Sequence, residues 1–273
     1  MSHTAPYEND ALRYAAVEVR FSPLDELEAA TIADFRERVR EDFAVSEAEQ
    51  QVAVNLGPTG PSTQQTFRQR FYTRDRITSA VLGRDLLILE TSDYPGWTEF
   101  RDRFARLARA LEGVKRPDGL LRVGIRYIDE IRVPGVESIA DWEPWISPNL
   151  IAPLTLDSTE PSGATLALQY GTAPGLVTVF RAAPFATGRT VQEEGPLRLP
   201  FPTPESPYFL LDTDSSWADP SRQIPEFAPD EIIVILDELH APCARLFEAS
   251  ITDRLRDEIL RQPRDEVWAG HGS

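Results

Sequence analysis

Cysteine, lysine and histidine are almost missing from this chain of 273 residues. Cys243 is the single cysteine, Lys115 the single lysine, and His240 the one histidine away from the two ends. A single cysteine excludes an intrachain disulfide framework. One internal histidine with one cysteine leaves too few ligands for a zinc centre, so we expect no metal and no cofactor.

Long apolar runs and cationic clusters are also missing. No apolar stretch approaches the 18–20 residues of a membrane span, and the first ten residues lack the cationic and apolar regions of a signal peptide. We therefore expect a cytoplasmic protein with no membrane partner. The 28 Lys and Arg residues face 44 Asp and Glu residues, a net charge of −16. Nucleic acids need clustered cations, so we expect a protein partner, a basic one if it is charged, and no nucleic acid.

The common catalytic signatures do not occur. Gly57-Pro-Thr-Gly60 lacks the Lys-Ser/Thr of a phosphate-binding loop. Asp237, His240 and Cys243 follow one another at steps of three, and each such step on a helix drifts by about 60°. Only neighbouring pairs of these three would meet, which argues against a nucleophile, base and acid acting together. We assign no catalytic residue; whether the protein is an enzyme stays open, and a non-enzyme is favoured.

The first part of the sequence contains apolar patterns typical of strands and helices, in a clear order along the chain. Tyr14 to Phe21 alternates as a half-buried strand does, and an amphipathic helical pattern runs from Leu24 to Phe43. A polar stretch, Asn55 to Gln65, carries the Gly and Pro of a loop. Further strands are predicted at Gln51 to Leu56, Thr66 to Thr73, Ile77 to Leu82 and Leu86 to Ser92. A helix from Trp97 to Gly113 closes this part.

The second part repeats that order. A strong strand pattern covers Leu120 to Val133, and Ser138 to Ile146 indicates a short helix. Strands at Thr165 to Tyr170, Leu176 to Arg181 and Pro207 to Trp217 follow. A long apolar face then extends from Ile232 to Ile259, after a start signal at Pro229-Asp230 and with Pro242 inside it.

These patterns predict an α+β fold of two tandem similar halves. Each half would be a curved antiparallel sheet packed against helices, in the order strand, helix, meander, helix, as in duplicated TBP-like or helix-grip folds. Residues 1–116 form the first repeat. Residues 117–273 form the second, with the long C-terminal helix, and both pack as one compact unit.

Three segments carry a resemblance to a family. They are Val17-Glu-Val-Arg-Phe21, Arg122-Val-Gly-Ile-Arg-Tyr-Ile-Asp-Glu-Ile131 and the stretch from Leu239-His-Ala-Pro-Cys243 to Ile251-Thr252. The chain resembles, over nearly its whole length, a sporadically distributed family of uncharacterised prokaryotic proteins. The family pattern has Asn where this chain has Asp129. The resemblance implies a bacterial accessory or defence-type role, and it brings no catalytic set, cofactor or ligand.

Five residues are the candidates for ligand binding: Arg122, Arg126, Tyr127, Trp217 and His240. Aromatic walls with a few polar groups are typical of small-molecule sites, although core residues of a sheet look the same in sequence. Arg122 and Arg126 share one strand face. They need acidic partners such as Glu90 or Asp212, or an anionic ligand, if that face is buried. Asp212 and Asp214 could bind a hard cation, or simply end a strand.

Two functions remain open. The first, which we favour, is a non-catalytic acidic binding or adaptor protein that engages a protein partner. The second is a small-ligand-binding protein or enzyme that uses the concave face of the sheet.

Overall fold

The computed structural model describes residues 7–25, 27–57, 60–157, 161, 163–193, 195–221 and 223–268, without the side chains of 51–66. They form an α+β fold around one antiparallel nine-stranded sheet, in the order β2-β3-β4-β5-β1-β6-β9-β8-β7. Nine segments make up this sheet: β1 (Leu12–Phe21), β2 (Val45–Gly57), β3 (Gly60–Tyr72), β4 (Thr78–Gly83), β5 (Leu86–Thr91), β6 (Leu120–Ile131), β7 (Leu166–Ala173), β8 (Leu176–Phe185) and β9 (Tyr208–Trp217).

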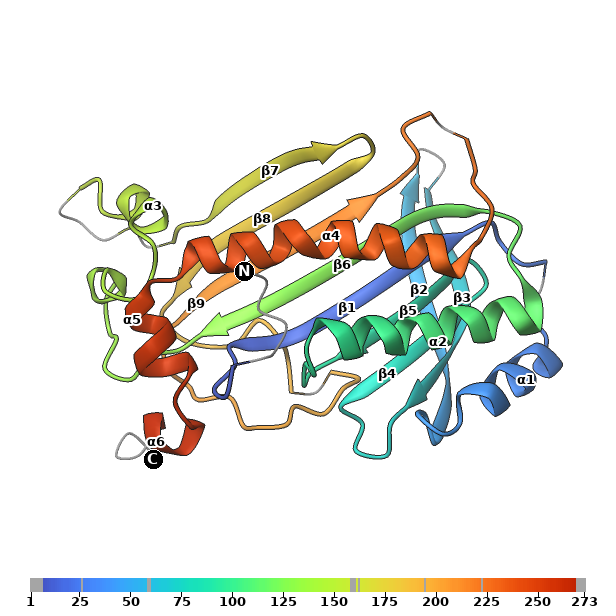
Figure 1. Cartoon of the computed structure of the whole chain (residues 1–273), viewed down its shortest axis with the longest axis horizontal. Helices are drawn as coiled ribbons and strands as arrows, with labels where there is room; N and C mark the ends of the chain where they lie inside the picture. The colour runs from blue at the N-terminus through green and yellow to red at the C-terminus, as the bar shows by residue number, and fades with distance from the viewer. Residues whose placement is uncertain are drawn as a thin grey trace.

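Helices cover one face of this sheet, as Figure 1 shows. The three longest are α1 (Ala29–Val39), α2 (Trp97–Lys115) and α4 (Pro229–Ser250). Short helical segments complete the fold: η1 (Ala140–Trp142), α3 (Pro148–Ile151), η2 (Ala152–Leu154), α5 (Asp253–Leu255), the π-helical η3 (Arg256–Leu260) and α6 (Arg264–Trp268). None of the helices described is both long and apolar enough to cross a membrane.

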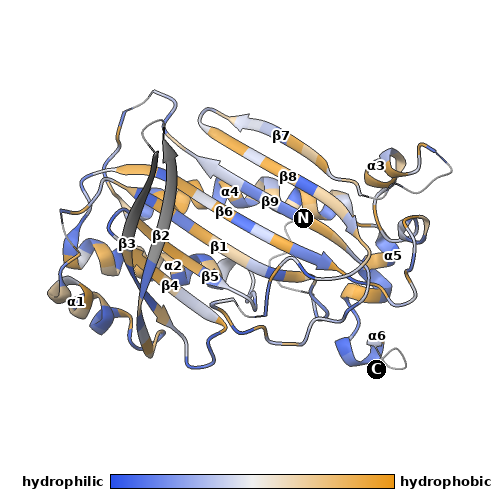
Figure 2. Ribbon diagram, turned by 180° about the vertical axis from the view of Figure 1, so that it is seen from behind, coloured by the Kyte–Doolittle hydropathy of each residue, from blue (hydrophilic) through white to orange (hydrophobic). Residues whose placement is uncertain are grey.

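The alternation in β1 explains how the layers pack. Ala15, Val17, Val19 and Phe21 are fully buried, whereas the residues between them are partly exposed. The buried set packs with the apolar stripes of α2 and α4 in one core, as expected where a strand turns one side toward helices. The view from behind shows the opposite face of the sheet, in front of these helices (Figure 2).

The strand order places the first strand of each sequence half at the centre of the sheet. β1 pairs with β5 on one side and with β6 on the other, and β6 pairs in turn with β9. The last strand before α2 and the last strand before α4 therefore each lie beside the strand that opens their half. One continuous sheet joins residues from both halves, and the helix-covered core draws on both.

The predicted loop at Asn55 to Gln65 is wrong for most of its length. β2 and β3 stay paired as far as Gly57 opposite Gly60, and residues 58 and 59 lie outside the described part of the chain. Cross-strand hydrogen bonds continue through this polar segment, which shows that Gly and Pro near a turn mark its position better than its length.

The predicted long helix also ends earlier than its apolar pattern suggests. α4 stops at Ser250, and the backbone of Ile251 and Thr252 is extended. The Ser147 amide donates to the Ser250 carbonyl at 2.8 Å, and the Thr252 amide donates to the Trp145 carbonyl at 3.1 Å. The Thr252 hydroxyl then caps the next turn by accepting from the Leu255 amide. Backbone pairing with a distant segment thus replaces helical hydrogen bonds.

Candidate functional site

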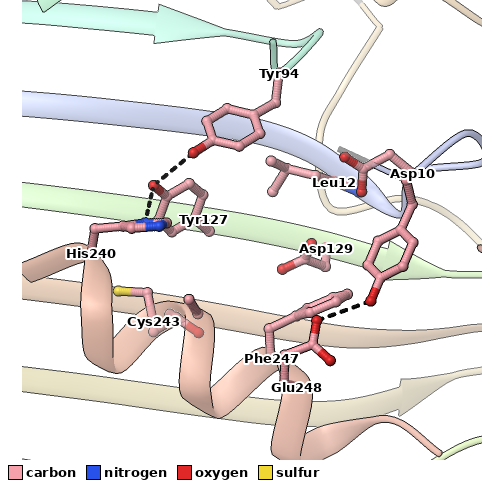
Figure 3. Close-up of a pocket in the computed structure, with 12 residues that line it drawn as sticks. Asp10, Leu12, Tyr94, Tyr127, Asp129, His240, Cys243, Phe247 and Glu248 are labelled. Atoms are coloured by element: carbon pink, nitrogen blue, oxygen red, sulfur yellow. Dashed lines mark hydrogen bonds between the residues drawn. The ribbon is translucent and has the colours of Figure 1, made fainter. Parts of the chain in front are cut away.

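A cavity of about 100 Å³ lies between α4 and the central strands β1, β6 and β9. Figure 3 shows side chains from the sheet and from the helix pointing into it. Its lining combines aromatic rings with carboxyl groups: Tyr7, Asp10, Leu12, Tyr94, Tyr127, Asp129, Thr213, His240, Cys243, Ala244, Phe247 and Glu248.

Local periodicity brings the strand and helix residues to this cavity. On β6, Val123, Ile125 and Tyr127 are buried on the helix-covered face, and the period of two places Asp129 on the same face. Asp129 lies opposite Leu12 of β1. On α4, His240, Cys243, Ala244 and Phe247 are spaced by three and four residues, which aligns them on one side of a helix.

A chain of hydrogen bonds connects β6 to α4 at one end of the cavity. The Tyr94 and Tyr127 hydroxyl oxygens lie 3.3 Å apart, and the Tyr127 hydroxyl lies 3.0 Å from His240 Nδ1 (Figure 3). The His240 ring stacks on the Trp97 indole with ring centres 4.3 Å apart. Burial lowers the pKa of His240 to about 4, so the imidazole is neutral at pH 7. Its Nε2 atom is buried with no hydrogen-bond partner among the described residues.

Two aspartates lie at the other end of the cavity. Asp129 is 6% exposed, and no described group donates a hydrogen bond to its carboxyl. Burial, reinforced by the charges of Asp10 and Asp212, raises the pKa of Asp129 well above its usual value. Asp10 accepts a hydrogen bond from the Leu12 amide at 3.0 Å. Burial raises the pKa of Asp10 to about 6, although this amide and the charge of Arg13 oppose the change.

The third carboxyl group of the cavity is paired. Glu248 accepts from the Tyr7 hydroxyl at 2.9 Å and from Arg256 at 2.9 Å. Burial and this contact with Glu248 raise the pKa of Tyr7 to about 12. Asp129 is thus the one carboxyl of the three that accepts no hydrogen bond from a described residue.

Asp237, His240 and Cys243 do not form a catalytic chain. The Asp237 carboxylate accepts from the Trp97 indole at 2.8 Å and contacts Arg101 at 3.4 Å. The Cys243 thiol donates to the Leu239 carbonyl at 3.3 Å, and burial raises its pKa, so the reactive thiolate is disfavoured. Within the described residues no three His, Cys, Asp or Glu side chains are grouped to hold a metal ion.

The structure separates the five residues proposed from the sequence. Tyr127 and His240 meet at the cavity. Arg122 and Arg126 lie on the face of β6 opposite to that of Tyr127. Trp217 is the last residue of β9 and is partly buried beside the core. The Arg126 guanidinium donates to both Asp212 oxygens, at 2.8 and 3.0 Å, and Asp212 is one of the acidic partners named from the sequence. Arg122 donates to Glu18 at 3.2 Å.

Sequence reasoning missed the acidic side of the cavity. Asp129 could have been found, because it follows Ile125 and Tyr127 at the strand period of two and so lies on the same buried face of β6. Asp10 and Glu248 carry no such signal, since their approach to Asp129 depends on how the chain before β1 and the helix α4 are placed.

No protein-family model matches the chain, and no curated protein matches it at a significant level. The resemblance to a sporadically distributed prokaryotic family therefore stays a proposal that rests on the three sequence segments given above.

Proposed function

We propose that this protein is a non-catalytic binding protein whose cavity under α4 takes a cationic group, either an amine or a guanidinium. The observation that carries the proposal is the carboxyl of Asp129, a residue that is 6% exposed and lines the cavity; this carboxyl accepts no hydrogen bond from the described residues. A buried carboxyl without a partner is costly. A bound cation would supply the missing charge and donor.

The walls of the cavity suit an organic cation. Tyr94, Tyr127 and Phe247 contribute aromatic rings, whose faces attract positive charge. The Asp10 carboxyl lies on the same lining as Asp129, so an ammonium group could share the two. A volume of about 100 Å³ suits a group of a few heavy atoms, such as a short alkylammonium or the end of a basic side chain.

This chemistry has two sources: a free small amine, or a lysine or arginine side chain of a basic protein partner. The net charge of −16 would attract either one and would be screened by salt. The acidic adaptor favoured from the sequence thus corresponds to the second source. The small-ligand alternative corresponds to the first, with the cavity under α4 in place of the concave sheet face.

Calorimetric titration with propylammonium and methylguanidinium tests the proposal, with propan-1-ol as the uncharged control. We expect wild type to bind a cation and not the alcohol, and to release protons on binding, because a cation favours the charged form of Asp129, whose pKa is raised by burial in the empty cavity. Asp129→Asn should lose about tenfold or more in affinity. Asp102→Asn, an exposed carboxylate on α2, is the matched control and should bind as wild type does.

Equal affinity of wild type and Asp129→Asn for these cations would refute the proposal. A lysine-rich peptide separates the two sources. If the peptide binds and propylammonium displaces it, a partner's side chain enters the cavity. If propylammonium binds and the peptide does not, the ligand is a free amine.

The duplication predicted from the sequence also belongs among the proposals. It is supported by the similar strand orders of five strands, β1-β5-β4-β3-β2, and of four strands, β6-β9-β8-β7, which start from two neighbouring central strands. In both halves a helix follows the strand that pairs with the first one. Two copies of one unit, joined side by side through their first strands β1 and β6, would give this arrangement.

A further inference from the structure

Three arginines converge on a second, smaller cavity at the end of the central strands. Arg13, Arg132 and Arg264 line a space of about 20 Å³, together with Glu130 and Asn9. Arg13 and Arg132 are each 5% exposed. The register between β1 and β6 shifts between Leu12 and Tyr14, which places Arg13 at an irregular point of the strand.

Glu130, a carboxylate of this cluster, is already hydrogen-bonded to other residues. Glu130 accepts from Arg132 at 3.0 Å and from the Thr190 and Val191 amides at 2.6 and 3.1 Å. Arg132 also donates to the Gly188 carbonyl at 2.7 Å. Arg264 lies over the Phe201 ring at 5.0 Å. These two arginines and Glu130 are therefore held in place by their own contacts.

Arg13 is the exception. Its guanidinium makes no hydrogen bond to any residue that the structure describes, and its Nε atom is buried without a partner. Burial and the charges of Arg264 and Arg132 lower its pKa to about 10, although Glu130 and Asp10 oppose this change. A group with that pKa still carries its proton at pH 7, so a buried cation with free donors faces the cavity.

We propose that Arg13, Arg132 and Arg264 form a binding site for a carboxylate group. A guanidinium presents its donors as a planar fork that matches the two oxygens of a carboxylate. The space of about 20 Å³ holds one or two water molecules, which fits a single carboxylate better than the larger phosphate. The site is separate from the cation cavity, with which it shares only Asp10.

Calorimetric and thermal titrations with sodium acetate, at ionic strength held constant with sodium chloride, test this site. We expect wild type to bind acetate and its Tm to rise by about 3 °C at ten times Kd. Arg13→Gln should lose about tenfold or more in acetate affinity. In acetate-free buffer its Tm should equal or exceed that of wild type, because an unpaired buried charge is removed. Arg261→Gln, an exposed arginine outside the cavity lining, should behave as wild type.

Unchanged acetate affinity in Arg13→Gln would overturn the proposal, as would an equal response of wild type to acetate and to inorganic phosphate. If Arg13→Gln does not fold, Arg264→Gln decides in the same way: lost affinity supports the site, and retained affinity refutes it. Asp129→Asn should still bind acetate, so failure of this site is distinguishable from failure of the cation cavity.

Discussion

The Tyr127 hydroxyl on β6 lies 3.0 Å from His240 Nδ1 on α4, and this contact joins the centre of the sheet to the helix that covers it. Tyr94 extends the chain at 3.3 Å, and Trp97 holds the imidazole from its other side by stacking. β6 and the stretch from Tyr94 to Trp97 thus fix the position of one neutral histidine at the wall of the cavity.

Removing the central hydroxyl of this chain should destabilise the fold. Tyr127→Phe leaves Tyr94 and His240 without their shared partner, and we expect a loss of about 1–2 kcal/mol in the free energy of unfolding by urea. Tyr170→Phe, at an exposed position on the edge strand β7, serves as control and should change stability by less than about 0.5 kcal/mol. Equal effects of the two substitutions would contradict the role given to the chain.

Asp10 should make stability fall as pH rises. Its folded-state pKa, about 6, exceeds its ordinary value of 3.8, so the folded protein binds more protons than the unfolded chain between these pH values. The contribution lost from pH 4 to 6 is at most about 3 kcal/mol. Asp10→Asn should remove this loss in urea unfolding measured from pH 4 to 8, and a slope identical to that of wild type would count against it.

His240 should act in the opposite direction over nearly the same range. Its folded-state pKa, about 4, is below its ordinary value of 6.5, so its contribution is present above pH 6.5 and is lost as pH falls toward 4. We expect His240→Gln to make stability decline more steeply with rising pH than in wild type, because Asp10 and Asp129 then act without opposition. If the unfolding free energy of His240→Gln instead rose with pH more steeply than that of wild type, the lowered pKa of His240 would be refuted.

Asp212 is shared by two arginines, so their removal should not be additive. Arg126 donates to Asp212 at 2.8 Å and Arg181 at 3.1 Å, while the Asp212 side chain is only 7% exposed. Either Arg126→Ala or Arg181→Ala should cost about 1 kcal/mol. The double variant should cost more than about 3 kcal/mol, because it leaves a buried carboxylate unpaired. Thermal and urea unfolding of wild type, the two single variants and the double variant measure these free energies.

The same arginines should matter little for binding. Arg126 lies outside the cation cavity, so Arg126→Ala should leave propylammonium affinity unchanged even as it lowers stability. Arg122→Ala, on the same strand face and partly exposed beside Glu18, is the control and should cost less than about 0.5 kcal/mol. Lost amine binding with an intact Tm in Arg126→Ala would show that this face holds the ligand.

Gly175 is required by the turn between β7 and β8. Its φ is +76°, and a Cβ atom there would lie 2.2 Å from the Ala218 carbonyl oxygen. Gly175→Ala should therefore destabilise the protein by about 1–3 kcal/mol. Gly171→Ala in the same hairpin has open space around its Cβ and should have a much smaller effect. Comparable losses in urea unfolding would argue against strain at Gly175.

The sequence by itself determined the order of the elements. Alternation in Tyr14 to Phe21 and the three- and four-residue steps from Trp97 to Leu111 are local patterns, and the structure has β1 and α2 there. The strands predicted at Ile77 to Leu82 and Leu86 to Ser92 are likewise local patterns, and β4 and β5 lie there. Such patterns predict the elements correctly because they depend only on which side of each element is apolar.

Only the tertiary structure decided which side chains meet. The Tyr7–Glu248 hydrogen bond spans 241 positions of the chain, and the end of α4 at Ser250 depends on backbone pairing with residues 145–147. Asp10 and Asp129 share a cavity because β1 lies beside β6, under α4. Periodicity fixes the face of each element, whereas charge balance in the interior depends on how those faces are brought together.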